Sequence, residues 1–301
     1  MEIQKTKQDI YATPCVVTSI DQCAFYHYMD IPGDGVVEGK WDLRGREDQY
    51  LGGVNFKGKR VLELGTASGC LCFYMESEGA EVVAHDIGEN QEWDVVPFCQ
   101  YDYRELVQEF KEYTNRLKNA YWYAHEAYNS KAKAVYGSVY DIPEEIGAVD
   151  VGTFCSILLH LRDPFLALQS ALRLVRETVI VTDLAPKYAL GSLSSPSRRS
   201  IRRLAALVKR CIFHEHTDSA EHRVPYMEFL PNFRTLGHKD AWWSLSPEII
   251  VNFLGVLGFE ETRVTYHLQK LYSREHRLFT VVGNRTKDIE PIRRAEHTEE
   301  D

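Results

Sequence analysis

The chain has 301 residues, of which 44% are hydrophobic and 26% are charged, enough apolar material for one large domain or two small ones. Its formal net charge of −9 argues against broad, nonspecific binding to nucleic acid or anionic lipid. No stretch approaches the roughly 20 apolar residues of a membrane span, and the charged N-terminus is unlike a signal peptide. The seven cysteines include no C-x-x-C pair, so we expect free thiols in a reducing, cytoplasmic compartment.

Residues 1–57 precede the first predicted strand and are interpreted as an N-terminal cap segment. Aromatic residues cluster around His27, and Trp41 is followed by two basic residues, Arg44 and Arg46. Histidine is the side chain whose pKa best suits proton transfer near pH 7, so His27 is a candidate base if this segment folds over a site. The alternative interpretation is a structural histidine.

The most informative part of the chain is a strand, a glycine turn and a distant acid. An apolar strand ends at Glu63, and Gly65 and Gly69 then allow a sharp turn into a helix. The next strand ends at Asp86, 21 positions after Gly65. An acid at about this separation can accept hydrogen bonds from ribose hydroxyls. The pattern predicts an adenosine-containing cofactor on a Rossmann-like sheet.

The turn itself indicates which cofactor to expect. It reads Gly65-x-Ala67-x-Gly69, whereas the dinucleotide fingerprint is G-x-G-x-x-G with backbone N–H groups on a pyrophosphate. Glu63 would repel a phosphate, but it suits S-adenosylmethionine (SAM), which carries an ammonium group and no phosphate. The segment resembles motif I of bacterial class I SAM-dependent methyltransferases, with Ala67 in place of the middle glycine. The alternative is a generic strand–turn–helix in another α/β domain.

Predicted strands and helices alternate along the rest of the core, which is typical of right-handed βαβ crossovers and a parallel sheet buried on both faces. Three further strands are expected at 134–137, 150–156 and 178–183. The last two, 261–267 and 277–284, are joined by a short polar link that forces an antiparallel hairpin. We therefore predict an α/β fold with a Rossmann-like, seven-stranded, mostly parallel sheet and an antiparallel last strand, as the resemblance implies.

The predicted methyltransferase domain covers residues 58–284 and carries two insertions, 93–131 and 184–240. Aromatic residues at helical spacing make the first insertion either a helix packed on the sheet or a cap that lines a substrate pocket. The second insertion includes a basic amphipathic segment, 197–210, interpreted as a solvated face or as a surface for an anionic substrate, RNA or a membrane. The charged tail, 285–301, is expected to be disordered.

The resemblance implies which residues hold SAM. Adenine recognition falls to Ser138 and Val139, although the family often has an acid at the position of Ser138. Cys155 and Ser156 should flank the methionine part, and a basic or aromatic residue before motif I should close over its carboxylate. The expected cofactor-binding residues are Trp41, Arg44, Arg46, Glu63, Gly65, Thr66, Ala67, Gly69, Asp86, Ile87, Ser138, Val139, Cys155 and Ser156.

The aromatic content of the predicted caps and the acidic net charge favour methyl transfer to oxygen, in preference to nitrogen, of a small molecule that is partly aromatic or apolar. A hydroxyl acceptor gains from a base, and we prefer His160 to His27 because it follows the fourth predicted strand. For His160 too, a structural role is the alternative. His214, His216 and His222 lack the spacing of a metal site, so no metal is expected.

Two other functions stay open. The element from His160 to Pro164, together with Trp242 and Trp243, resembles enzymes that carboxymethylate the wobble uridine of tRNA, so tRNA is the alternative to a small-molecule partner. Ala67 and Ser138 depart from the family pattern and favour a non-catalytic, ligand-binding protein. No membrane partner is expected, and the sequence decides neither the methyl acceptor nor the oligomeric state.

Overall fold

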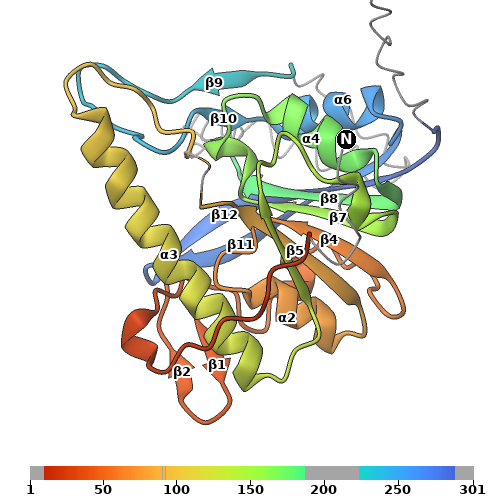
Figure 1. Cartoon of the computed structure of the whole chain (residues 1–301). Coiled ribbons are helices and arrows are strands. Elements are labelled where there is room, and N and C mark those ends of the chain that lie inside the picture. Colours follow the sequence, from red (N-terminus) through yellow and green to blue (C-terminus); the bar gives the residue numbers. More distant parts are fainter. Residues whose placement is uncertain (1–9, 90, 92, 187–223, 289–301) are drawn as a thin grey trace, which may run out of the picture.

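The computed structural model describes residues 10–89, 91, 93–186 and 224–288 (Figure 1). The sequence-predicted segment 197–210, the histidines at 214, 216 and 222, and most of the tail lie outside these ranges. The core of the described part is a sheet whose strands in spatial order are β3 (Trp41–Asp42), β11 (Glu261–Leu271), β12 (Arg274–Asn284), β8 (Val175–Leu184), β7 (Val149–Cys155), β4 (Arg60–Leu64), β5 (Glu81–Ile87) and β6 (Lys133–Gly137).

The sheet confirms the predicted Rossmann-like class. Strands β8, β7, β4, β5 and β6 run parallel, and β12 pairs antiparallel with both β8 and β11. The two strands of the final hairpin are longer than predicted, and only Tyr272 and Ser273 separate them. Both have positive φ, 45° and 66°, as a two-residue hairpin turn requires. An eighth strand, β3, was not predicted, since two residues are too few to show a period.

Helices cover both faces of the sheet. Figure 1 shows α2 (Cys70–Ser77) and α3 (Tyr103–Ala127) on one side, and α4 (Pro164–Leu172) and α6 (Pro247–Val256) on the other. Neighbouring strand residues point to opposite faces of the sheet. Val61 therefore belongs to the same hydrophobic cluster as Leu71 of α2, and Leu62 to the same cluster as Leu168 of α4. Both faces are therefore apolar, which explains the nearly continuous hydrophobic runs of the parallel strands.

Helix α3 accounts for most of the predicted aromatic insertion. Asp102 caps its N-terminus by accepting hydrogen bonds from the N–H groups of Arg104 and Glu105. Near its C-terminus, Tyr121 stacks on Phe73 of α2 with 5.4 Å between ring centroids. Its other half extends past the sheet towards the hairpin of β9 (Met227–Phe229) and β10 (Trp243–Leu245) (Figure 1). The helix thus both packs on the core and forms a wall beyond it.

The N-terminal segment lies across the turn that follows β4. It comprises the 3₁₀ turn η1 (Ile20–Gln22), the hairpin of β1 (Met29–Ile31) and β2 (Gly35–Val37), strand β3 and the short helix α1 (Glu47–Tyr50). The N–H of Tyr26 donates to Ser68 Oγ at 3.2 Å, and the N–H of Tyr28 donates to the carbonyl of Trp41 at 2.7 Å. These bonds hold the segment beside the carboxyl end of the parallel strands.

The start of the predicted disordered tail is ordered. The Arg285 guanidinium donates to the carbonyls of Val175 and Leu172, at 2.8 and 2.6 Å. These contacts tie residues 285–288 to the core, because a guanidinium can satisfy several carbonyls at once.

Candidate active site

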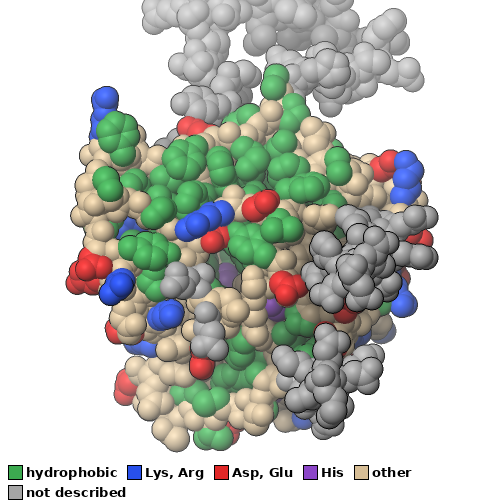
Figure 2. Space-filling model, turned by 45° about the horizontal axis from the view of Figure 1, so that its top comes forward, with side chains coloured by type: hydrophobic (Ala, Val, Ile, Leu, Met, Phe, Trp, Pro, Cys, Tyr) green, Lys and Arg blue, Asp and Glu red, His purple; other side chains and the backbone are tan. Residues whose placement is uncertain are grey.

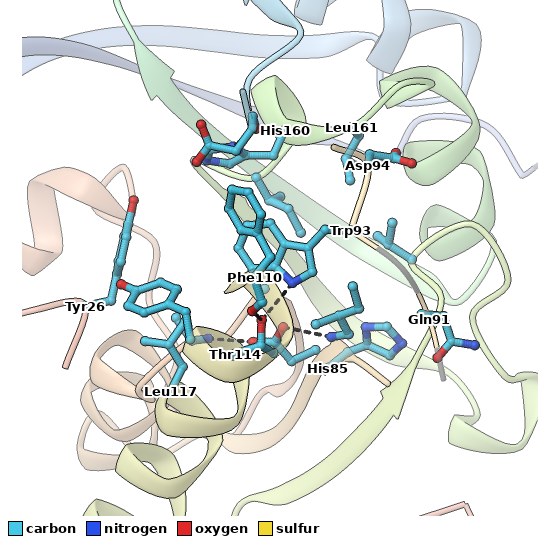
Figure 3. Close-up of a pocket in the computed structure, with 18 of the residues that line it drawn as sticks. Tyr26, His85, Gln91, Trp93, Asp94, Phe110, Thr114, Leu117, His160 and Leu161 are labelled. Carbon is cyan, nitrogen blue, oxygen red and sulfur yellow. Dashed lines mark hydrogen bonds between the residues drawn. The ribbon is translucent and has the colours of Figure 1, made fainter. Parts of the chain in front are cut away.

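A cavity of about 520 Å³ opens at the carboxyl end of the parallel strands. The short 3₁₀ turn η3 (Leu158–His160) follows β7 at this edge and contributes His160 to the lining, whereas η2 (Glu144–Ile146) directly precedes β7. The walls come from the β4 turn, the ends of β5, β6 and β7, helix α3 and the N-terminal segment (Figure 3). Figure 2 shows a hollow on this face with histidine side chains inside it and hydrophobic side chains gathered above it. Open α/β sheets bind ligands at this edge, and a cavity of this size accommodates a small molecule or cofactor.

The glycine turn and the distant acid meet in this cavity. Gly65 and Ala67 line it together with Asp86. The Asp86 carboxylate accepts hydrogen bonds from the N–H groups of Ala67 and Ile87, each at 2.7 Å. Ala67 has a φ of 50°, a left-handed conformation that costs an alanine roughly 1–2 kcal/mol. A glycine would adopt the same conformation without this cost. Each oxygen of Asp86 keeps a lone pair for a ligand hydroxyl.

Glu63, at the end of β4, and Thr66 and Gly69 of the turn do not contribute to the cavity lining. Glu63 is buried, and its Oε2 has no hydrogen-bond partner in the described part of the chain. Burial raises the pKa of Glu63 to about 7, and the carboxyl of Asp86 adds to the rise while the hydroxyl of Thr66 opposes it. A cation bound nearby would favour the ionised form of Glu63.

At one end of the cavity lie Ser138 and Val139, the residues expected around adenine, and Ile87, another expected cofactor-binding residue. The Ser138 hydroxyl accepts a hydrogen bond from the N–H of Tyr140 at 3.2 Å. It therefore caps the turn after β6.

Cys155 and Ser156 line the cavity at the end of β7. Burial holds the pKa of the Cys155 thiol well above its usual value, so this cysteine is a packing residue and a poor nucleophile. Ser156 has a positive φ of 54°. Its Oγ lies 2.8 Å from the hydroxyl of Tyr50, and its N–H donates to Thr182 at 2.7 Å.

The structure does not bring Trp41, Arg44 or Arg46 to the cavity wall. Trp41 pairs with Leu271 in the sheet, and Arg44 forms an ion pair with Asp42 at 2.8 Å. Arg46 donates to the carbonyl of Leu268 at 3.0 Å. Trp41 is buried in the core next to the cavity, and the two arginines are held by these contacts outside it.

The basic residue of this segment that lines the cavity is Lys40. Its Nζ lies 4.5 Å from the ring centroid of Tyr113 and 5.5 Å from that of Tyr26. Its N–H donates to Tyr26, and its carbonyl accepts from Tyr272. No sequence motif marks Lys40, although it directly precedes Trp41.

Both candidate bases line the cavity, but their surroundings differ. His160 Nδ1 is hydrogen-bonded to the backbone carbonyl of Asp240. A carbonyl only accepts, so Nδ1 carries the proton and Nε2 keeps a free lone pair. His27 is buried, its Nδ1 has no partner among the described residues, and burial lowers its pKa to about 4.

Aromatic side chains form the wall opposite the sheet. Trp93 packs against Phe110 with 4.9 Å between ring centroids, and its indole N–H donates to Thr114 at 2.7 Å. Figure 3 shows Phe110 and Trp93 side by side below His160, with Tyr26 on the other side of Phe110 from Trp93. Sequence periodicity left open whether the predicted aromatic insertion packs on the sheet or lines a pocket, and its helix does both. Periodicity did not single out four further lining residues, which share no motif: His85, Gln91, Asp94 and Asp240.

No family model and no curated protein matches the chain. Among solved structures it is similar to the N-terminal domain of EvdMO1 with bound S-adenosylhomocysteine (SAH), at 16% identity over 89% of this chain and 93% of that one, with a TM-score of 0.49. It is also similar to SAH-bound magnesium protoporphyrin IX methyltransferase from Synechocystis, at 13% identity over 80% of each chain and a TM-score of 0.43. A third is 1,6-didemethyltoxoflavin-N1-methyltransferase from Burkholderia thailandensis, at 10% identity over 81% and 78%, with a TM-score of 0.43. Likenesses at this level assign neither a family nor a substrate.

Two other features of the described residues bear on the site. No group of three or more His, Cys, Asp or Glu side chains in these ranges is arranged to hold a metal ion. Within the same ranges, none of the helices combines the length and hydrophobicity that a bilayer crossing needs.

Proposed function

We propose that this protein is a SAM-dependent methyltransferase. The observation that carries the proposal is the meeting of Gly65, Ala67 and Asp86 in one cavity whose far side holds His160. Further support comes from the order of the sheet, in which the antiparallel β12 lies between β8 and β11. A buried acid at Glu63, close behind the turn, suits a cationic ligand better than a pyrophosphate.

The residues of the cavity fit the parts of SAM. Asp86 has the free lone pairs to accept ribose hydroxyls, and Ile87 and Val139 offer apolar contact to a purine. Lys40 has no carboxylate partner in the described part of the chain, so its ammonium suits the methionine carboxylate better than Arg44 or Arg46. When bound, SAM supplies an electrophilic methyl group on its sulfonium.

The acceptor that best suits the cavity is a small, flat molecule with a hydroxyl group. Trp93, Phe110 and Tyr113 provide aromatic contact, and the free Nε2 of His160 can take the hydroxyl proton as the new bond forms. Positioning of the acceptor supplies much of the remaining rate. Oxygen is preferred to nitrogen because an amine acceptor gains less from a base.

Calorimetry with SAH tests the cofactor. We expect saturable binding that is lost in Asp86→Ala and kept in Asp141→Ala, a control at an exposed position close in sequence to the adenine end. Binding of NADH without binding of SAH contradicts the proposal.

Two experiments separate the rival functions. Production of SAH from SAM in the presence of a metabolite extract distinguishes an enzyme from a non-catalytic binding protein. A filter-binding titration with bulk tRNA tests the RNA alternative. Micromolar, salt-sensitive binding that charge reversal of Arg198, Arg199, Arg202 and Arg203 abolishes favours tRNA.

A further inference from the structure

His85 is a buried histidine at the end of β5, next to Asp86 in sequence. It lines the cavity, is 2% exposed, and its Nε2 has no hydrogen-bond partner in the described ranges. Burial lowers the pKa of His85 to about 4, so its imidazole is neutral near pH 7. Buried polar atoms without partners are rare in native structures, because each forfeits the hydrogen bond it made with water.

The surroundings of Nε2 leave room for a ligand. In the paired strands β5 and β6, Ile87 lies opposite Gly137. A Cβ at Gly137 would lie 3.5 Å from His85 Nε2 and would meet no other atom within 4 Å. The glycine therefore keeps the space beside Nε2 open at the end of the cavity where Val139 lies. Figure 3 shows His85 and Gln91 close together at this end, on the side away from Tyr26.

His85 offers an unused acceptor at this end of the cavity. The Ser138 hydroxyl already accepts a hydrogen bond from the N–H of Tyr140, and the remaining lone pairs of Asp86 are those assigned to the ribose hydroxyls. A neutral imidazole with the proton on Nδ1 presents Nε2 as a lone pair. The 6-amino group is the only donor on the adenine ring.

We propose that His85 Nε2 accepts a hydrogen bond from the 6-amino group of the cofactor adenine, in the role for which the family often has an acid at the position of Ser138. The proposal rests on the proposed function, since it assumes that SAM occupies the cavity. His85 is then a specificity-determining residue, and Gly137 places no side chain beside its nitrogen.

A double-mutant cycle, in which one change is made in the ligand and the other in the side chain, tests this contact. The affinities of SAH and of its analogue without the 6-amino group are measured by calorimetry for the natural protein and for His85→Phe. We expect the missing amino group to weaken binding about tenfold in the natural protein, as loss of one hydrogen bond predicts. In His85→Phe the two ligands should bind equally. An equal penalty in both proteins overturns the proposal.

Three further variants sharpen the result. His85→Gln keeps an acceptor and should restore part of the preference for the amino group. Gly137→Ala should weaken SAH binding by shielding Nε2, while His85 itself is left unsubstituted. If Ser138→Ala abolishes the preference and His85→Phe keeps it, Ser138 is the acceptor and the proposal fails. Circular dichroism melting curves establish that each variant is folded. If SAH does not bind the natural protein at all, the proposed function fails as well.

Discussion

The carboxylate of Asp86 accepts a hydrogen bond from the backbone N–H of Ala67, with 2.7 Å between Oδ2 and nitrogen. This bond joins the end of β5 to the turn after β4, and it holds an alanine in a left-handed conformation. The shape of the turn after β4 therefore depends on a side chain from another strand.

We expect Ala67→Gly to raise the free energy of unfolding by up to about 1 kcal/mol, because glycine adopts positive φ without strain. Gly69→Ala should do the opposite. Its φ is 86°, and a Cβ there would lie 2.4 Å from the Phe73 ring. Urea denaturation of the two variants measures both effects. A loss of stability in Ala67→Gly contradicts the strain at this position.

His160→Ala should bind SAH almost as tightly as the natural protein and turn over at least about tenfold more slowly, since a general base typically contributes roughly 10²–10⁴-fold. Steady-state kinetics and calorimetry on the same samples separate the two effects. His238→Ala, at an exposed position in a nearby loop, is the matched control. If His27→Ala is slow and His160→Ala is not, His27 is the base. If both keep full rate, the enzyme works by positioning alone.

Glu63 should release a proton when the cofactor binds. Its carboxyl, with a pKa of about 7, is mostly protonated at pH 6, and a bound ammonium group lowers that pKa. Binding at pH 6 should therefore release up to about one proton, and affinity should rise with pH until about pH 7. Calorimetry in two buffers of different ionisation enthalpy counts the protons. Glu63→Gln should release fewer protons, and an unchanged count contradicts the assignment.

Asp183 should make the stability of the fold depend on pH. Burial raises the pKa of Asp183 to about 7, and its Oδ2 has no partner among the described residues. The raised pKa of an acid favours the folded state at low pH, and this advantage is lost between about pH 4 and pH 7. Relative to the natural protein, Asp183→Asn should gain up to about 4 kcal/mol over that range. Urea denaturation at several pH values, with Asp141→Asn as the exposed control, measures the gain. A constant difference between Asp183→Asn and the natural protein rules out this role of Asp183.

The parallel strands and the long helix were predictable because each carries a strong hydrophobic period or run. Strand β3 was not, since its two residues form a strand only by pairing with Lys270 and Leu271. The backbone of Lys40 is likewise held by the far end of the chain, since its carbonyl accepts a hydrogen bond from the N–H of Tyr272.

The cavity itself was predictable only where a motif marks it. Asp86 follows from its distance to Gly65, because the cofactor chemistry fixes that separation. His85, one residue earlier, has no such mark. It is identified only by its burial, its unpartnered nitrogen and the bare Cα of Gly137 beside it. Sequence reasoning finds groups that chemistry requires at fixed spacing, whereas packing alone determines the others.

Pairing of β3 with β11 has a consequence for the order of folding. Asp42 lies opposite Lys270, and β12 inserts between β11 and β8. During synthesis, the edge of the sheet that orients Lys40 therefore cannot form until the last hairpin has left the ribosome. Contacts between such distant segments form slowly. Strand β3, next to Lys40, therefore gains its sheet partner only near the end of translation, and the nascent chain has no complete site until its final strands arrive.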